Sequence, residues 1–215
     1  MATVAEQFIA SLESADTYTD PYPHWILSRV LPDDICADMD TLDVPMAPAA
    51  AYDAGRREAN NSSRAFFDAE RQAENPSVAA VAQALKAPET IAAIERVTGA
   101  QLDGSLLRIE YCQDGDGFWL EPHTDIGAKL FTMLIYLSVG EGSDNCGTDV
   151  FDDDKNLVKS APFKFNSALI FVPGTNTWHG FNRRKINGVR KSIIVNYVKP
   201  EWRSRHELAF QDPVK

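Results

Sequence analysis

The chain changes its hydrophobic pattern near Gly99. Before this residue, apolar side chains recur at helical spacing in residues 4–14, 31–42 and 75–99. After it, short runs rich in β-branched and aromatic residues occupy 104–111, 129–138, 167–174 and 191–198, separated by clusters of Gly, Asp and Asn. The pattern therefore predicts helices in the first hundred residues and strands in the second.

Local signals refine the helical half. Pro32 and the acids after it mark a helix start, while Pro88 breaks the alanine-rich stretch 75–99 into one or two helices that Gly99 ends. Residues 53–77 are polar and rich in turn formers, which indicates a surface loop or a mobile cover.

Several short strands after a group of helices indicate an α+β protein whose sheet is a sandwich, a jelly roll or a barrel, with the helices packed against the outside of the sheet. The 215 residues suit a single domain. We expect residues 1–100 to be mainly helical support and loop, residues 101–200 to form the sheet and carry the chemistry, and residues 201–215 to be a C-terminal tail.

Composition narrows the function classes. The formal charge of −10 and the pI near 4.8 disfavour a nucleic-acid partner, which usually requires a basic surface. No apolar run is long enough to span a bilayer, and the first residues lack the pattern of a secretory signal, so we expect no membrane association. The 3 cysteines show neither zinc spacing nor an even disulfide count, which favours a reducing cytoplasm.

The stretch "EPHTDIGAKL", residues 121–130, contains the first candidate for chemistry. His123 and Asp125 are two positions apart, so in an extended segment their side chains project to the same side. If His179, at the end of a later predicted strand, joins them, two imidazoles and one carboxylate form the facial triad of non-haem Fe(II) oxygenases. The alternative is a loop histidine that is hydrogen-bonded to a nearby acid.

Arg190 and Ser192 follow His179 on the next predicted strand and point the same way. A guanidinium matches a carboxylate with two parallel hydrogen bonds, and a serine hydroxyl adds a further donor. This pair suits the far carboxylate of a dicarboxylic keto acid. The alternative is a surface arginine that precedes a strand.

From about Leu106 to Val198 the chain resembles the 2-oxoglutarate and Fe(II)-dependent oxygenase superfamily, and its prolyl 4-hydroxylase-like branch in particular. Five segments carry the resemblance in the family's order: "YCQDGDGFWLEPHTD", "FTMLIYLS", "CGTDVF", "ALIFVPGTNTWHGF" and "GVRKS". The resemblance implies a double-stranded β-helix, that is, a jelly-roll core. It also implies Fe(II) as cofactor, 2-oxoglutarate as cosubstrate, and O2.

Carried over position by position, the resemblance implies that His123, Asp125 and His179 are the iron ligands and catalytic residues. Arg190 would bind the distal carboxylate of 2-oxoglutarate, with Ser192 beside it. Three further positions match residues that contact the cosubstrate in relatives, namely Tyr111, Tyr136 and, less directly, Thr132. Packing in the core is the alternative for the two tyrosines.

Two departures from the family pattern concern the substrate. The turn between Tyr111 and His123 is longer than usual, and the family's Gly-Gly-Glu-Thr appears as "CGTD", in which Thr148 aligns. Both lie where relatives contact the prime substrate. The sequence thus predicts a 2-oxoglutarate-dependent dioxygenase that hydroxylates a C–H bond of a small molecule or a peptide side chain. The alternatives are a cupin-like metalloenzyme that does not use 2-oxoglutarate and a non-catalytic jelly-roll binding module.

Overall fold

The computed structural model describes residues 2–46, 52–53, 55 and 64–215. Its helices are α1 (Val4–Glu13), α2 (Asp33–Asp40), α3 (Ala69–Glu74), α4 (Pro76–Lys86) and α5 (Pro88–Thr98). Its strands are β1 (Asp16–Tyr18), β2 (His24–Ser28), β3 (Ala65–Phe66), β4 (Leu106–Asp114), β5 (Leu120–His123), β6 (Lys129–Tyr136), β7 (Asp149–Phe151), β8 (Leu157–Ser160), β9 (Ser167–Phe171), β10 (His179–Phe181) and β11 (Arg190–Val198). A 3-10 turn, Arg205–Glu207, lies in the C-terminal segment.

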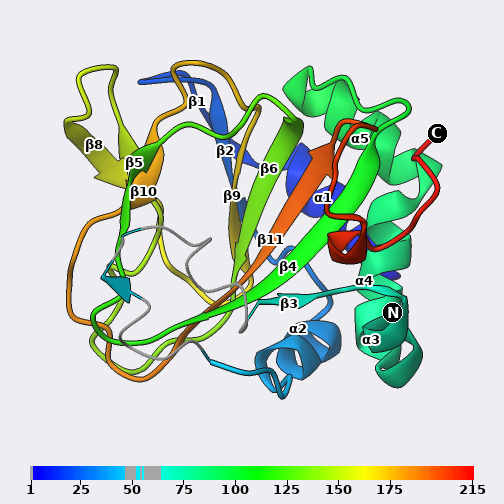
Figure 1. The fold of residues 1–215 in the computed structure, drawn as a ribbon, viewed down its shortest axis with the longest axis horizontal. Coiled ribbons are helices and arrows are strands. Elements are labelled where there is room, and N and C mark those ends of the chain that lie inside the picture. Colours follow the sequence, from blue (N-terminus) through cyan, green and yellow to red (C-terminus); the bar gives the residue numbers. More distant parts are fainter. Residues whose placement is uncertain (1, 47–51, 54, 56–63) are drawn as a thin grey trace.

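The strands form two antiparallel sheets. The larger sheet has 7 strands in the order β1-β2-β9-β6-β11-β4-β3, and the smaller has 4 in the order β5-β10-β7-β8. In Figure 1 the large sheet crosses the middle of the molecule and β5, β8 and β10 lie on the left. The prediction of helices combined with a sheet is confirmed, and both sheets are antiparallel.

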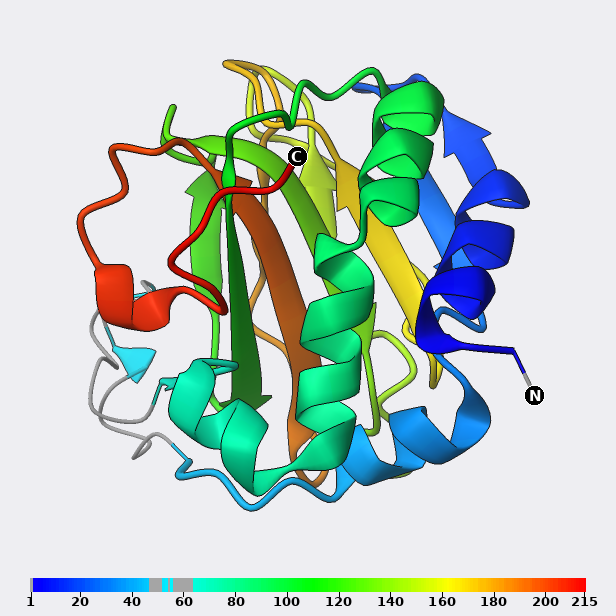
Figure 2. The same ribbon diagram turned by 90° about the vertical axis from the view of Figure 1, so that its right-hand side faces the viewer.

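The helices lie against one face of the large sheet. Figure 2 shows α1, α4 and α5 standing in front of its strands. The main hydrophobic core fills this interface, where Leu12, Leu85 and Ile94 of the helices join Ile109 and Val195 of the sheet in one buried cluster. The Tyr197 hydroxyl also donates to the Leu85 carbonyl at 2.5 Å, so α4 is bonded to β11 as well as packed on it.

A second buried cluster lies between the two sheets. It contains Leu134 and Phe171 from the large sheet and Val150 and Phe181 from the small one. Because side chains alternate across a strand, β6 and β11 contribute one set of residues to this interior and the other set to the helical face. The candidate chemistry lies on the interior side.

The helix signals of the sequence are borne out locally. Asn75 caps α4 by accepting hydrogen bonds from the Ser77 and Val78 backbone amides, and Pro88 begins α5 directly afterwards. Gly99 ends α5 with φ 75°, a left-handed conformation that glycine adopts without steric cost.

The first hundred residues also contribute strands that the hydrophobic pattern did not predict. β2 pairs with β9 inside the large sheet, and β1 extends its edge. In the segment 53–77, taken from the sequence as loop, β3 pairs with β4 and α3 begins after the Asp68 cap. Residues 54 and 56–63 of that segment lie outside the described residues. None of the helices in the part of the chain that the structure describes is long and apolar enough to cross a membrane.

Gly147, in the segment that aligns with the family's Gly-Gly-Glu-Thr, tolerates no side chain. A Cβ atom added there would lie 1.7 Å from the Ala161 carbonyl oxygen, whereas one added at Gly127 meets nothing within 4 Å. We therefore expect Gly147→Ala to lower the free energy of unfolding by about 1–3 kcal/mol, the usual cost of overpacking, because the backbone near β7 must shift. Chemical denaturation measures this change. Gly127→Ala is the matched control, and equal stability of the two variants would contradict the prediction.

Candidate metal centre

Three side chains from two distant parts of the chain converge in the structure. His123 is the last residue of β5, His179 is the first residue of β10, and the two are directly paired across the antiparallel ladder. Asp125 follows in the turn before β6. One potential ligand atom from each of the three residues lies within 4.8 Å of the other two. The structure thus brings together the three residues that the sequence predicted as metal ligands.

Backbone carbonyls set the proton positions of both imidazoles. His123 Nδ1 lies 2.8 Å from the Glu121 carbonyl oxygen, and His179 Nδ1 lies 2.9 Å from the Thr177 carbonyl oxygen. A carbonyl oxygen only accepts, so each Nδ1 carries the hydrogen and donates it. In the neutral ring Nε2 then holds the free lone pair, which is the arrangement that metal-binding histidines use.

Asp125 remains ionised although its side chain is 3% exposed. Burial by itself would raise its pKa, but the Lys129 ammonium and the hydrogen bonds from Lys129 and Thr132 hold the pKa well below the usual range. Lys129 Nζ donates to Oδ1 at 2.5 Å and Thr132 Oγ1 donates to Oδ2 at 2.6 Å. A deprotonated carboxylate is the form that coordinates a cation.

His179 remains neutral for a different reason. Burial lowers its pKa to about 4, and the neighbouring His123 acts in the same direction, while Asp125 opposes the change. The ring is 5% exposed and packs against Phe171, with ring centroids 4.6 Å apart. The site therefore presents two imidazoles and one carboxylate, a donor set that fits a divalent transition metal.

A cavity of about 710 Å³ adjoins the three ligands. Its lining includes Arg190, Thr148, Leu134 and Phe181 in one part. Another part is lined by charged and aromatic side chains, namely Arg64, Phe66, Arg108, Glu110, Trp202, His206 and Glu207. Its volume lies in the usual range for small-molecule sites, which is about 300–1,000 Å³.

Arg190, the predicted carboxylate anchor, is 2% exposed and lines this cavity. Its Nη1 donates to Asp114 Oδ2 at 2.7 Å, and its Nε donates to the Cys146 carbonyl at 2.7 Å. The Phe181 ring lies 4.9 Å from the guanidinium carbon. Two edges of the guanidinium are thus fixed by the protein, while its position in the cavity lining leaves it accessible to a ligand.

Of the other predicted cosubstrate residues, Tyr136 and Ser192 face the same interior side, because they are paired across β6 and β11. Neither is among the residues that line the cavity. The Tyr136 hydroxyl donates to Thr148 Oγ1 at 2.9 Å, and Thr148 does line it. Ser192 Oγ is buried without a hydrogen-bond partner among the described residues. Thr132 lines the cavity and bonds to the candidate ligand Asp125.

Tyr111 lies on the opposite face of the sheet. It pairs with Ile193, one position from Ser192, and belongs to the core cluster beneath the helices. This is the packing alternative that the sequence left open, and the geometry gives no support to a contact between Tyr111 and a cosubstrate.

Sequence reasoning missed several charged groups of the site. Lys129 lies in the same ten-residue stretch as His123 and Asp125, so its proximity could have been noticed. Arg108 and Glu110 alternate with apolar residues in β4, a pattern that indicates a polar interior. Asp114 carries no local signal, because its partner Arg190 is distant in the sequence.

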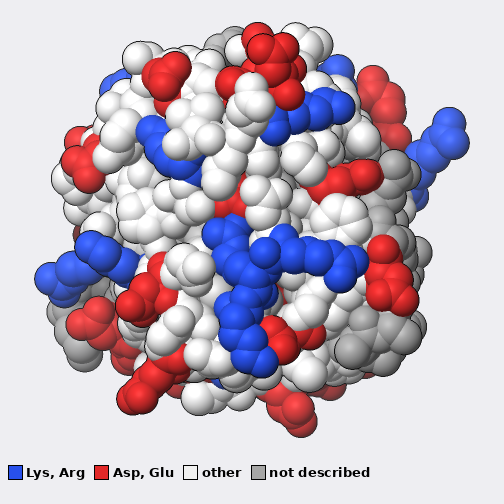
Figure 3. Space-filling model, turned by 90° about the vertical axis from the view of Figure 1, so that its left-hand side faces the viewer, with Lys and Arg blue, Asp and Glu red and all other residues white. Residues whose placement is uncertain are grey.

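Basic side chains on the outer surface are mostly balanced by acids. Figure 3 shows a group of Lys and Arg side chains in the middle of one face, with Asp and Glu side chains around it. In the basic stretch 182–191, Lys185 Nζ bonds to Asp116 Oδ2 at 2.6 Å and Arg184 is paired with Asp149. The Lys185 pair lies in solvent, whereas Arg184 is paired with a carboxylate that is fully buried.

Comparisons with known proteins agree with this geometry at the level of the fold. No model of a protein family matches the chain, and no curated protein sequence matches it. Solved structures of known proteins do match the chain. A prolyl hydroxylase from Trichoplax adhaerens, in complex with a hypoxia inducible factor oxygen degradation domain peptide fragment, superimposes with a TM-score of 0.55 and 15% identity over 91% of this chain and 89% of that one.

Two further structures are similar. A Pseudomonas putida prolyl-4-hydroxylase has a TM-score of 0.54 and 14% identity, with 92% of this chain and 94% of that chain covered. HygX from Streptomyces hygroscopicus, with nickel and 2-oxoglutarate bound, has a TM-score of 0.52 and 13% identity, with 84% of each chain covered. The chain therefore has the fold of the oxygenase class that its motifs resemble.

We expect His179→Ala and Asp125→Ala to abolish binding of Mn²⁺, because each removes one of three ligands. Isothermal titration of the metal-free protein measures this. His206→Ala, which changes a histidine outside the three-residue set, should retain the wild-type affinity for Mn²⁺. Tight binding to His179→Ala would show that the metal lies elsewhere.

Proposed function

We propose that this chain is an Fe(II)- and 2-oxoglutarate-dependent dioxygenase that hydroxylates a C–H bond of a small molecule or peptide side chain. The observation that carries the proposal is the convergence of His123, Asp125 and His179 beside a cavity that also contains the buried Arg190. We further propose that the two facing sheets are the halves of a jelly roll, with all 215 residues forming one catalytic domain.

In this proposal His123 and His179 would hold the metal through Nε2, which the backbone carbonyls leave free, and Asp125 would hold it through its carboxylate. Iron, 2-oxoglutarate and O2 together supply the oxidising power, with succinate and CO2 as products. The protein fixes the tautomers of both histidines, keeps Asp125 ionised and provides the adjoining cavity. Such sites act by orientation and exclusion of water.

Arg190 would bind the distal carboxylate of 2-oxoglutarate. Its Nε and Nη1 hold Cys146 and Asp114, so Nη2 is the group that remains for the ligand among the contacts of the described residues. Ser192 supports this assignment, because it projects from the same face of β11 and its buried hydroxyl lacks a partner among the described residues. A carboxylate in the cavity would bond to Arg190, which lines it, whereas Ser192 itself does not line the cavity. Thr148 and, behind it, Tyr136 would complete the polar wall.

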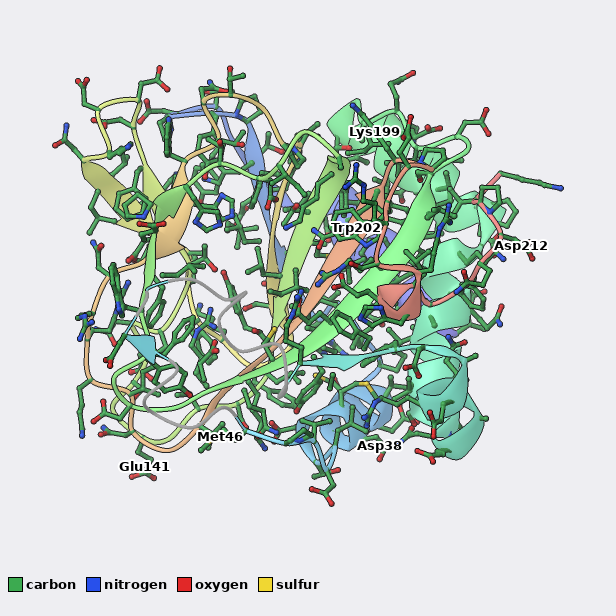
Figure 4. All side chains as sticks on the ribbon, viewed as in Figure 1. Asp38, Met46, Glu141, Lys199, Trp202 and Asp212 are labelled. Atoms are coloured by element: carbon green, nitrogen blue, oxygen red, sulfur yellow. The ribbon has the colours of Figure 1, made fainter. Side chains whose placement is uncertain are left out.

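The prime substrate would occupy the part of the cavity that lies away from Arg190. The C-terminal segment contributes Trp202 and Glu207 to this part. Figure 4 shows Trp202 on that segment, close to the large sheet. The tail is therefore proposed to form a wall of the substrate site. The complex of the Trichoplax enzyme with a peptide makes a peptide side chain one candidate substrate, and the cavity volume suits a small molecule equally well.

The two alternative functions that the sequence left open differ from the proposed dioxygenase in what they require of Arg190. Neither a cupin-like metalloenzyme nor a binding module with a vestigial site requires a buried arginine beside the ligands. Anaerobic addition of Fe(II) and then 2-oxoglutarate should produce the weak visible charge-transfer band of the chelate if the proposal holds. Its absence from a protein that binds Fe(II) would favour the cupin-like alternative. Screening candidate compounds for stimulated succinate release then identifies the substrate.

Arg190→Leu should weaken 2-oxoglutarate binding about tenfold or more, because it removes a charge-assisted hydrogen bond without removing a metal ligand. The KM for 2-oxoglutarate and the concentration dependence of the visible band measure this effect. Arg203→Leu, at an exposed position of the C-terminal segment, is the control and should leave both values unchanged. Wild-type affinity in Arg190→Leu would remove Arg190 from the proposed site.

A further inference from the structure

A continuous row of polar side chains crosses three neighbouring strands of the large sheet, β4, β11 and β6, and ends on the candidate ligand Asp125. Thr132 of β6 pairs with Asn196 of β11, which in turn pairs with Arg108 of β4. All three are 2% exposed or less. Neighbouring strands lie about 4.8 Å apart, so the row spans roughly 10 Å of the interior. It starts at the candidate ligand Asp125 and ends at Arg108, which also lines the cavity.

The hydrogen bonds of this row are continuous. Arg108 Nη1 donates to Asn196 Oδ1 at 3.0 Å, Asn196 Nδ2 donates to Thr132 Oγ1 at 3.0 Å, and Thr132 Oγ1 donates to Asp125 Oδ2 at 2.6 Å. Asn196 Nδ2 also approaches the Phe131 carbonyl at 3.4 Å.

The guanidinium determines the direction of every bond in the row. Arginine has donors and no acceptor, so the Asn196 atom facing Arg108 is the carbonyl oxygen and its amide nitrogen must face Thr132. The Thr132 hydroxyl accepts from that nitrogen, and its single hydrogen is then directed at Asp125. Replacement of any member by a group of the wrong donor or acceptor type would interrupt the row.

The far end of the row is firmly anchored. Arg108 Nε donates to Glu207 Oε2 at 2.5 Å, and Nη2 donates to Glu110 Oε2 at 2.6 Å. The rings of Phe66 and Trp202 lie 5.0 Å and 5.7 Å from the guanidinium carbon. Since the C-terminal segment supplies both Trp202 and Glu207, its position is linked to the metal site through Arg108.

At the near end, each oxygen of Asp125 has one donor. Thr132 donates to Oδ2 and Lys129 to Oδ1, from opposite sides of the carboxylate. Two donors on different oxygens prevent rotation of the carboxylate about its Cβ–Cγ bond. A carboxylate held in this way offers one defined lone pair to a cation instead of a range of orientations.

We infer that Thr132, Asn196 and Arg108 are positioning residues that orient Asp125 for metal binding. This gives Thr132 a different role from the cosubstrate contact that the family resemblance implied. The inference rests on the proposed function, since it assumes that Asp125 is a metal ligand. Partners of metal ligands typically change metal affinity by about 10–100-fold when they are replaced.

Thr132→Val tests the inference, because valine keeps the shape of threonine and removes the hydroxyl. Its Mn²⁺ affinity, measured by isothermal titration of the metal-free protein, should fall about tenfold or more. Thr132→Ser retains the hydroxyl and should restore an affinity close to wild type. If Thr132 only stabilised the fold, Thr132→Val would lower the melting temperature of the metal-free protein. It would not cause a selective loss of Mn²⁺ affinity.

Asn196→Asp provides an independent test of direction. An aspartate has no donor for Thr132, so the threonine hydroxyl would donate to residue 196 and leave Asp125. We expect a loss of Mn²⁺ affinity similar to that in Thr132→Val, and no further loss when the two changes are combined. Wild-type affinity in both single variants would overturn the inference while leaving the metal site intact. Failure of the unaltered protein to bind Mn²⁺ would instead overturn the proposed function.

Discussion

The pairing of β5 with β10 is the constraint on which the candidate site depends. It places His123 directly opposite His179, and side chains at directly paired positions lie on the same face with Cβ atoms about 4.5–5.5 Å apart. That separation allows two imidazoles to reach one ion. β10 has 3 residues and is held on its other side by β7, where His179 faces Val150. His179 therefore has a defined position in this short strand. The turn after β5 then brings Asp125 close to the two histidines.

Because side chains alternate along the central strands, the polar residues of the candidate site lie on one face of the sheet and the apolar residues that stabilise the fold lie on the other. On β11, Arg190, Ser192 and Asn196 face the interior between the sheets, whereas Ile193 and Val195 face the helices. The helical face is apolar and closely packed, and it contributes the hydrophobic stabilisation. The interior face holds charged groups at the cost of desolvation, which hydrogen-bonded partners offset. Asp114 forms such an ion pair with Arg190, and Glu110 and Glu207 form ion pairs with Arg108.

Much of the fold could be predicted from local pattern, because helices and their ends depend on neighbours in the sequence. Helices α1, α4 and α5 lie where periodicity, Pro88 and Gly99 placed them. The strands β1, β2 and β3 could not be predicted in the same way. β2 has 5 residues, and its position depends on β9, which is more than a hundred residues further along the chain. The pairing with β9, and not the pattern of this short segment, therefore holds β2 in the sheet.

For the candidate site, the sequence by itself determined the types of ligand and their spacing: residue chemistry made His123, Asp125, His179 and Arg190 candidates, and the resemblance to the oxygenase superfamily selected them. The tertiary structure alone decided which face each strand residue occupies. Tyr111 and Tyr136 matched the same kind of role in the sequence, yet one packs beneath the helices and the other faces the interior. The physical reason is that a period of two fixes only relative orientation along a strand, while the pairing of distant strands decides which side is inside. The same pairing aligned Thr132, Asn196 and Arg108 in one row.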